Sequence, residues 1–100
     1  MHINKRDAIE VLRQHEADLR ARGIIHVALF GSVARGEARS DSDIDIMIEL
    51  DPEAKIDVFQ YAGIKMYIEG LFETPVDVVD REALKPYVRV PATGDAIYAF

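Results

Sequence analysis

The residues numbered 31–45 read GSVARGEARSDSDID, and they lie between two stretches that have the pattern of β-strands. The stretch before them, IIHVALF at 24–30, is apolar at both alternating sets of positions, which is typical of a buried central strand. The stretch in which they end, DIDIMIEL at 43–50, has isoleucine or leucine at every second position. This pattern predicts two strands joined by a small polar connection, with room for one short helical turn after Ser32.

The pair Asp43 and Asp45 is predicted to place two carboxylates on one face of the second strand, roughly 6.6 Å apart along the chain. Two like charges at that distance repel by about 2 kcal/mol at an effective dielectric near 20, and a divalent cation removes this repulsion. Side-chain oxygens on a rigid backbone, with positions left for water and phosphate oxygens, are how proteins usually hold Mg²⁺. An Asp-x-Asp pair alone more often marks only a solvent-exposed strand face, so the neighbouring sequence decides whether it indicates a metal site.

That context is supplied by Gly31 and Ser32, which stand where the first strand gives way to the helical turn. Glycine allows close backbone approach, and the free N–H groups at a helix start favour an anionic phosphate. The Ser32 hydroxyl adds a hydrogen-bond donor. Arg35, one turn further on, is a candidate phosphate contact, with a surface pairing to Glu37 as the alternative. A phosphate cradle followed by a metal-binding strand is the minimal equipment for nucleotidyl transfer.

A third carboxylate is expected, because two-metal phosphoryl transfer needs a ligand that binds the second ion and activates the attacking hydroxyl. Asp77 is the best candidate, since it lies between valines in a short apolar stretch at 76–79. The alternation of a strand turns Asp80 to the other face or beyond the strand end, which favours Asp77.

Signals for helices flank the predicted strands. Asn4 or Asp7 is a candidate cap for a first helix, whose apolar residues share one face and which Gly23 ends. A second helix is predicted before Gly70 and Pro75, which mark its end. Its apolar stripe consists of Val58, Tyr61, Ile64, Ile68, Leu71 and Phe72.

The remaining segments are short. A third strand is predicted at 76–79, followed by a helical turn at 81–85 that Asp80 caps. The tail at 87–100 has no clear pattern, although its last residues are unusually apolar for a free terminus. The order helix, strand, turn, strand, helix, strand predicts a small α/β domain with a three-stranded core, occupying residues 1–100 as a single domain.

Composition excludes several classes of protein. The chain has 100 residues, a net charge of -6 and no cysteine, so disulfides, thiolate nucleophiles and cysteine zinc sites are absent. An acidic chain has no broad basic surface for a nucleic-acid backbone, and the longest apolar run, 24–30, falls far below the ~20 residues of a membrane span. We therefore expect a soluble cytoplasmic protein with no membrane contact and no direct nucleic-acid binding.

The site residues also carry a family resemblance. Gly31-Ser32, ten intervening residues and Asp43-Ile44-Asp45 resemble the Gly-Ser-x10-Asp-x-Asp signature of the DNA polymerase β-like nucleotidyltransferases. The fuller string, with Arg35-Gly36 and with Ser42 before Asp43, is similar to the minimal nucleotidyltransferases (MNT), the antitoxin halves of HEPN/MNT toxin–antitoxin modules. The likeness extends from the first helix to the third strand. It implies a small nucleotidyltransferase fold, in which a three-stranded mixed sheet is flanked by helices.

The resemblance also implies an activity and its residues. MNT antitoxins transfer AMP from ATP to a tyrosine of a partner HEPN RNase toxin and so silence it, which implies a hetero-oligomer with that toxin. ATP is then the substrate and Mg²⁺ the cofactor, with two ions. Carried over by position, the catalytic metal ligands are Asp43, Asp45 and Asp77, and the nucleotide contacts are Gly31, Ser32, Arg35 and Ser42.

Two other functions remain open at this point. The chain could be a non-catalytic antitoxin that blocks its partner by binding, although a dead site has no need of three aligned carboxylates. It could instead be a nucleotidyltransferase with a small-molecule acceptor such as an aminoglycoside. That reaction normally needs a helical domain to hold the acceptor, and no segment of this sequence has that pattern.

Overall fold

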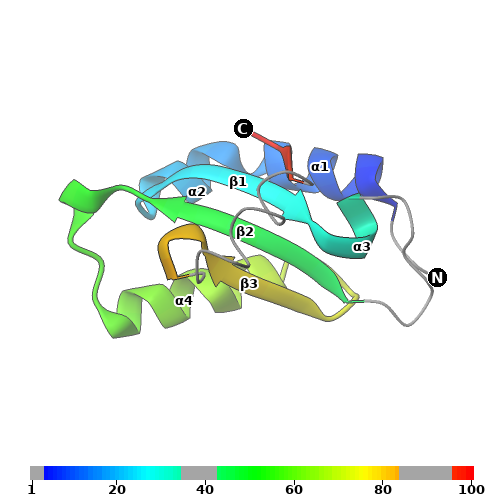
Figure 1. Ribbon diagram of the computed structural model, residues 1–100. Coiled ribbons are helices and arrows are strands. Elements are labelled where there is room, and N and C mark those ends of the chain that lie inside the picture. The colour runs from blue at the N-terminus through cyan, green and yellow to red at the C-terminus, as the bar shows by residue number, and fades with distance from the viewer. Residues whose placement is uncertain (1–3, 35–42, 84–95) are drawn as a thin grey trace.

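The computed structural model describes residues 4–34, 43–83 and 96–100, and its centre is one mixed β-sheet with strand order β3-β2-β1-β4 (Figure 1). The β2 strand is antiparallel to β1 and parallel to β3, and β4 is antiparallel to β1. The strands are β1 (Ile24–Phe30), β2 (Ile44–Leu50), β3 (Val76–Asp80) and β4 (Ile97–Tyr98). As the apolar pattern of 24–30 predicts, β1 lies inside the sheet.

Strand register divides the side chains between two faces of the sheet. Leu29 pairs with Ile46, and Ile46 pairs with Val78 on the other side. These three side chains are at most 2% exposed and face the helices. The same core contains the helix residues Leu12, Leu19, Ile64 and Ile68. Because side chains alternate along a strand, Phe30 and Asp45, which are also paired, lie on the opposite face.

The helices are α1 (Lys5–Gln14), α2 (Glu16–Ala21), α3 (Gly31–Ala34) and α4 (Val58–Glu69), with 3-10 turns η1 (Pro52–Ala54) and η2 (Arg81–Ala83). Three of the predicted elements are thus present: the short turn after the first strand, the second helix and the turn that follows β3. Within the described residues, no helix combines the length and the apolar character that crossing a membrane would require.

The prediction of one helix ending at Gly23 is wrong, because the segment is two helices that break at His15. The ring Nδ1 of His15 lies 2.8 Å from the carbonyl oxygen of Val11. That carbonyl is the ordinary i−4 acceptor for the His15 backbone N–H, which instead donates to Leu12 O at 3.2 Å. At the start of α1, the cap is Asn4, whose Oδ1 accepts from Asp7 N at 2.9 Å.

The predicted three-stranded core is also wrong in number, since β4 adds a fourth strand at the edge beside β1. Ala28 pairs with Tyr98, and beyond the strand Ala99 N donates to Val27 O at 2.8 Å. Arg13 Nε donates to Ala99 O at 2.9 Å and ties the segment to α1. The apolar C-terminal residues, which fitted no sequence pattern, are therefore packed against the core.

The second helix begins at a capping box. Gln60 N donates to Asp57 Oδ1 at 2.7 Å, and Asp57 N donates to Gln60 Oε1 at 2.9 Å. Ile64 and Ile68 pack into the core as the predicted stripe requires. Val58 does not, because it is 79% exposed at the first turn, so its place in the buried stripe was a wrong prediction.

Candidate active site

The parallel pairing of β2 with β3 places Asp45 beside Asp77. The two residues are Cα partners in the register of the strands, and neighbouring strands lie about 4.8 Å apart. Partners in a parallel pair point to the same face, and here that is the face opposite the helices. Asp45 is half-buried, whereas Asp77 is exposed. Two of the three carboxylates selected from the sequence are thus adjacent in space although they are far apart along the chain.

Asp43 precedes β2 directly and is exposed. It is two residues from Asp45, so the alternation of the strand keeps both on the side of Asp77. Asp80 behaves differently, because it is the register partner of Ile48 and so belongs to the helix-covered face. Its Oδ1 accepts from Glu82 N at 3.0 Å and caps η2, as the sequence predicts for a cap at this position.

Gly31 joins β1 to α3 at the same end of the sheet. Its φ of 73° lies in the left-handed region that favours glycine. A Cβ built at residue 31 would lie 3.1 Å from Asp45 Cγ and 3.3 Å from Asp45 Cβ, and would overlap Asp45 Oδ2. The backbone at the start of α3 therefore touches the Asp45 side chain, and the candidate phosphate cradle adjoins the candidate metal ligand.

Three other residues selected from the sequence have side chains that the structure does not describe. Ser32 belongs to α3, but only its backbone is described. Arg35 and Ser42 lie outside the described residues altogether. Their proposed contacts with nucleotide rest on position in the sequence.

The donor chemistry of the site fits Mg²⁺. Asp43, Asp45 and Asp77 offer hard carboxylate oxygens on the side of the sheet opposite the helices, and Mg²⁺ in proteins is usually held by one or two carboxylates together with water and substrate phosphates. In the described part of the chain, no three carboxylate or imidazole groups already converge as a metal cluster. Asp43, Asp45 and Asp77 are thus not gathered into a formed metal site in this structure.

Tyr61 of α4 lies behind β3. Burial raises the pKa of its hydroxyl, the charges of Asp80 and, more weakly, Asp77 raise it further, and a backbone hydrogen bond with Asp80 lowers it. Tyr61 is therefore a neutral hydroxyl at physiological pH. The apolar pattern places Tyr61 only in the helix stripe, and its proximity to Asp80 appears only once α4 is docked on the sheet.

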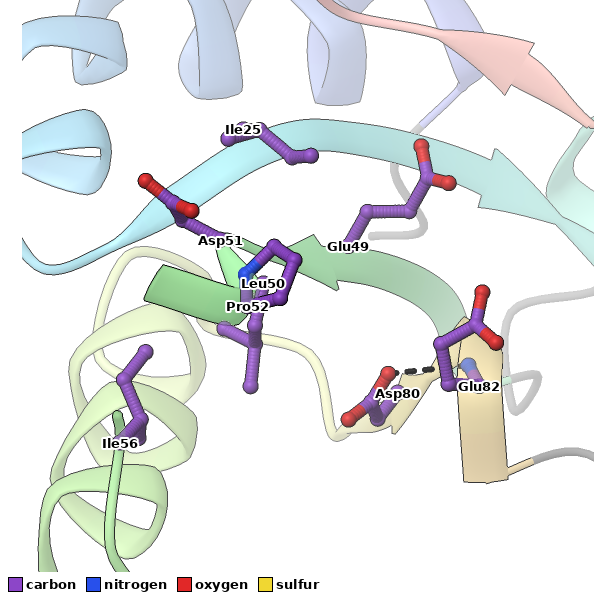
Figure 2. A pocket seen from close by; sticks show the side chains of 8 residues that line it. All are labelled: Ile25, Glu49, Leu50, Asp51, Pro52, Ile56, Asp80 and Glu82. Carbon is purple, nitrogen blue, oxygen red and sulfur yellow. Dashed lines mark hydrogen bonds between the residues drawn. The ribbon is translucent and has the colours of Figure 1, made fainter. Parts of the chain in front are cut away.

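A hollow of about 530 Å³ lies at the other end of the sheet, between the start of β1 and the ends of β2 and β3 (Figure 2). It contains none of the residues selected from the sequence. Beside it, Arg81 Nη1 lies 3.4 Å from Glu49 Oε1 and 3.2 Å from Glu82 Oε1. Its lining is Ile25, Glu49, Leu50, Asp51, Pro52, Ile56, Asp80 and Glu82. The candidate site is thus at the start of β2, on the face opposite the helices and away from this hollow.

Comparison with known proteins places this geometry in context. Residues 8–99 match the family model of the nucleotidyltransferase domain. MJ1379 of Methanocaldococcus jannaschii, an inferred protein adenylyltransferase, is 36% identical over 91 residues, covering 89% of this chain and 91% of that protein. The protein adenylyltransferase MntA of Thermococcus cleftensis is 30% identical over 89 residues, covering 88% of each chain.

Solved structures show the same fold. An inferred minimal nucleotidyltransferase superposes with a TM-score of 0.71 at 33% identity, covering 96% of both chains. An MNT antitoxin structure, solved with the tri-AMPylated HEPN toxin of Shewanella oneidensis, superposes with a TM-score of 0.64. It is 16% identical and covers 92% of this chain and 71% of that one, so it shows similarity of fold alone.

Proposed function

The chain belongs to the nucleotidyltransferase domain family and is a protein adenylyltransferase related to MntA, and from this premise we propose that it transfers AMP from ATP to a tyrosine of a cognate HEPN toxin. The proposed transfer neutralises the toxin, so the chain acts as its antitoxin within a hetero-oligomer. Because the reaction consumes ATP and requires Mg²⁺ as a cofactor, the proposed location is the cytoplasm.

The observation that carries the proposal is the pairing of Asp45 with Asp77 beside Gly31. Two Mg²⁺ ions would be held by Asp43, Asp45 and Asp77. The bound metal would neutralise the negative charge of the triphosphate. The half-buried side chain of Asp45 lies against the Gly31 backbone, so the proposed metal ligand adjoins the proposed phosphate contact. Asp77 is exposed, so it is accessible to an acceptor that arrives from solvent.

The proposed transfer makes one bond and breaks one bond at the α-phosphorus of ATP. The tyrosine oxygen forms a bond to the α-phosphorus of ATP, and the bond from that phosphorus to the β-phosphate bridging oxygen breaks. Pyrophosphate leaves, and the tyrosine proton passes to Asp77 or to water. Since Asp77 shares a face with Asp45, proton acceptance and phosphate binding take place on the same side of the sheet.

Nucleotide contacts are proposed for Gly31, Ser32, Arg35 and Ser42. Gly31 supports this role because, without a Cβ, its backbone at the start of α3 lies against the Asp45 side chain, so a phosphate bound at this turn would adjoin the proposed metal ligand. Ser32 follows it directly in α3. Arg35 and Ser42 are proposed on their positions in the sequence, between the cradle and the first aspartate.

The proposal is tested by incubating the purified chain and its cognate toxin with Mg²⁺ and ATP labelled on the α-phosphate. We expect label on the toxin, and a loss of about 100-fold or more with Asp43→Ala or Asp45→Ala. Glu53→Ala, which removes an exposed carboxylate from η1, is the matched control and should label like wild type. Undiminished labelling by both aspartate variants would contradict the mechanism.

A cellular experiment separates catalysis from simple blocking. Cells that express the toxin should be rescued by the wild-type chain and not by a variant with alanine at Asp43, Asp45 and Asp77. Rescue by the triple variant, at equal expression and with the toxin still bound, would mean that the antitoxin acts by occlusion.

A further inference from the structure

The α4 helix is apolar on nearly all sides. Its sequence is VFQYAGIKMYIE, in which Gln60, Lys65 and Glu69 are the residues with an amide or a charge. Ile64 and Ile68 are at most 2% exposed and attach the helix to the core. A helix on the surface of a monomer normally turns a polar face to water, and one that is apolar all round is normally covered on both sides.

The side of α4 that faces away from the core carries the most exposed large apolar side chains. Phe59 is 86% exposed and Met66 is 71% exposed. With about 100° between successive residues, Phe59, Ala62, Gly63 and Met66 form one stripe opposite Ile64 and Ile68. We call these four residues the outer stripe. Val58, 79% exposed, adjoins it at the first turn of the helix.

The exposed area is large for an isolated chain. Taking roughly 200 Å² for a large apolar side chain, Val58, Phe59 and Met66 expose about 450 Å², which is in the range of the largest apolar patch on a typical monomer. Two such patches pressed together would bury about 900 Å² from these side chains alone. A specific interface begins near 1,200 Å² in total, and the flanks of both helices can supply the remainder.

The outer stripe is self-complementary. From Phe59 to Met66 its side chains run large, small, small, large, with the midpoint between Ala62 and Gly63. A two-fold axis through that midpoint, perpendicular to the helix, sets Phe59 of one copy against Met66 of the other, a favourable sulfur–aromatic contact. A Cβ built at Gly63 has no atom within 4 Å, so this position is open to a second backbone.

Charge favours a second copy over a charged partner. The chain carries a net charge of -6, so two copies repel each other least where they meet through an uncharged surface. The four residues of the outer stripe are uncharged, and the nearest charges on α4, Lys65 and Glu69, are of opposite sign and lie together on one side of it. A strongly basic partner would instead be attracted to the acidic surface elsewhere.

The position of α4 is consistent with an assembly that leaves the reaction site accessible. The helix packs on the core face of the sheet, alongside β3 (Figure 1). Asp45 and Asp77 belong to the opposite face by the register of their strands. A protein held at the outer stripe would have to pass round the sheet to place a tyrosine at these carboxylates. A second copy docked there blocks neither site.

We propose that α4 is a dimerisation helix, with the outer stripe packed antiparallel against the same stripe of a second copy of this chain. The dimer does not depend on the carboxylates or on the proposed transfer of AMP. In this dimer the two sheet faces that carry Asp45 and Asp77 point away from each other, so each copy offers its own site to an acceptor.

The mass of the chain in solution tests this assembly. At about 100 µM, well above a micromolar Kd, light scattering coupled to gel filtration should give twice the chain mass for wild type and for Asp45→Ala. Phe59→Glu and Met66→Glu should each reduce the measured mass to that of one chain. Their circular dichroism spectra should match that of wild type, which would show that the variants are folded. Gln60→Glu adds the same charge beside the outer stripe, keeps the capping box and should leave the dimer intact.

Two further variants locate the axis. The chain has no cysteine, so Ala62→Cys gives a single thiol near the two-fold axis that should cross-link under mild oxidation, while Glu53→Cys on η1 should not. Gly63→Ala should weaken dimerisation several-fold without lowering the stability of the dilute monomer, since the added methyl meets nothing in one copy. A wild-type chain that is monomeric at 100 µM would overturn the proposal. If Phe59→Glu then also abolished binding of the toxin, the outer stripe would be the toxin-binding surface and not a dimer interface.

Discussion

The side chain of Asp45 lies against the backbone of Gly31, at the point where β1 turns into α3. This contact joins the two sequence elements that are ten residues apart in the motif but meet in space through the antiparallel pairing of β1 with β2. Glycine is therefore required at position 31 for two reasons: the backbone has a positive φ there, and a Cβ would overlap the Asp45 carboxylate. The short spacing between the glycine and the aspartates is thus a consequence of strand pairing.

Gly31→Ala should damage both stability and activity. The methyl group would be strained at φ 73° and would displace the Asp45 carboxylate, so we expect a loss of about 1–3 kcal/mol in the free energy of unfolding and a marked fall in AMP transfer. Urea denaturation and the labelling assay measure the two effects. Gly70→Ala is the control, because its φ of -71° suits alanine; equal effects of the two substitutions would argue against the Gly31–Asp45 contact.

Asp77→Asn and Asp80→Asn should have opposite outcomes although both residues lie in β3. Asp77 shares the face of Asp45, so removing its charge should lower label transfer by about 100-fold or more. Asp80 is on the helix-covered face, and asparagine retains a side-chain oxygen for the Glu82 N–H, so this variant should stay close to wild type. Initial rates at saturating ATP provide the measurement. The reverse order of activities would mean that the wrong aspartate has been selected.

The strands and the relative facing of the aspartates could be predicted because they depend on local alternation. The apolar positions of 44–50 and the valines around Asp77 determine which way each carboxylate points. That Asp45 and Asp77 are adjacent could not be read in the same way, because it depends on the parallel register of β2 and β3, a long-range property. The resemblance to a family supplied that step by implying the topology.

The errors have equally specific causes. A strand of two residues, such as β4, has no period to detect, and its partner β1 is distant in the sequence. The break at His15 comes from an imidazole that takes a backbone carbonyl, which no hydropathy pattern records. Val58 was assigned to the buried stripe because α4 is apolar on several sides, so periodicity could not distinguish the covered side from the outer one.

Removal of the α4 cap should destabilise the fold without touching the chemistry. Asp57→Ala loses the acceptor for Gln60 N and should lower the free energy of unfolding by about 1 kcal/mol. Because the capping box lies at the far end of α4 from the start of β3, AMP transfer at low temperature should be unchanged. Urea midpoints report the first effect, and Glu73→Ala, at an exposed position after α4, is the control. A loss of activity with full stability would instead connect this turn to the site.

Stability should fall in alkali in a way that depends on Tyr61. Burial, together with the charge of Asp80, raises the pKa of its hydroxyl in the folded state above the unfolded value near 10. The folded state therefore binds the proton more tightly, and this contribution is fully present below about pH 10 and is lost as the pH rises through the folded pKa. The free energy of unfolding, measured by urea from about pH 8 to pH 11, should decline less steeply in Tyr61→Phe than in wild type. Tyr98→Phe, on the exposed edge strand β4, provides the comparison; identical slopes for wild type and Tyr61→Phe would mean that the Tyr61 hydroxyl ionises as freely in the folded chain as in the unfolded one.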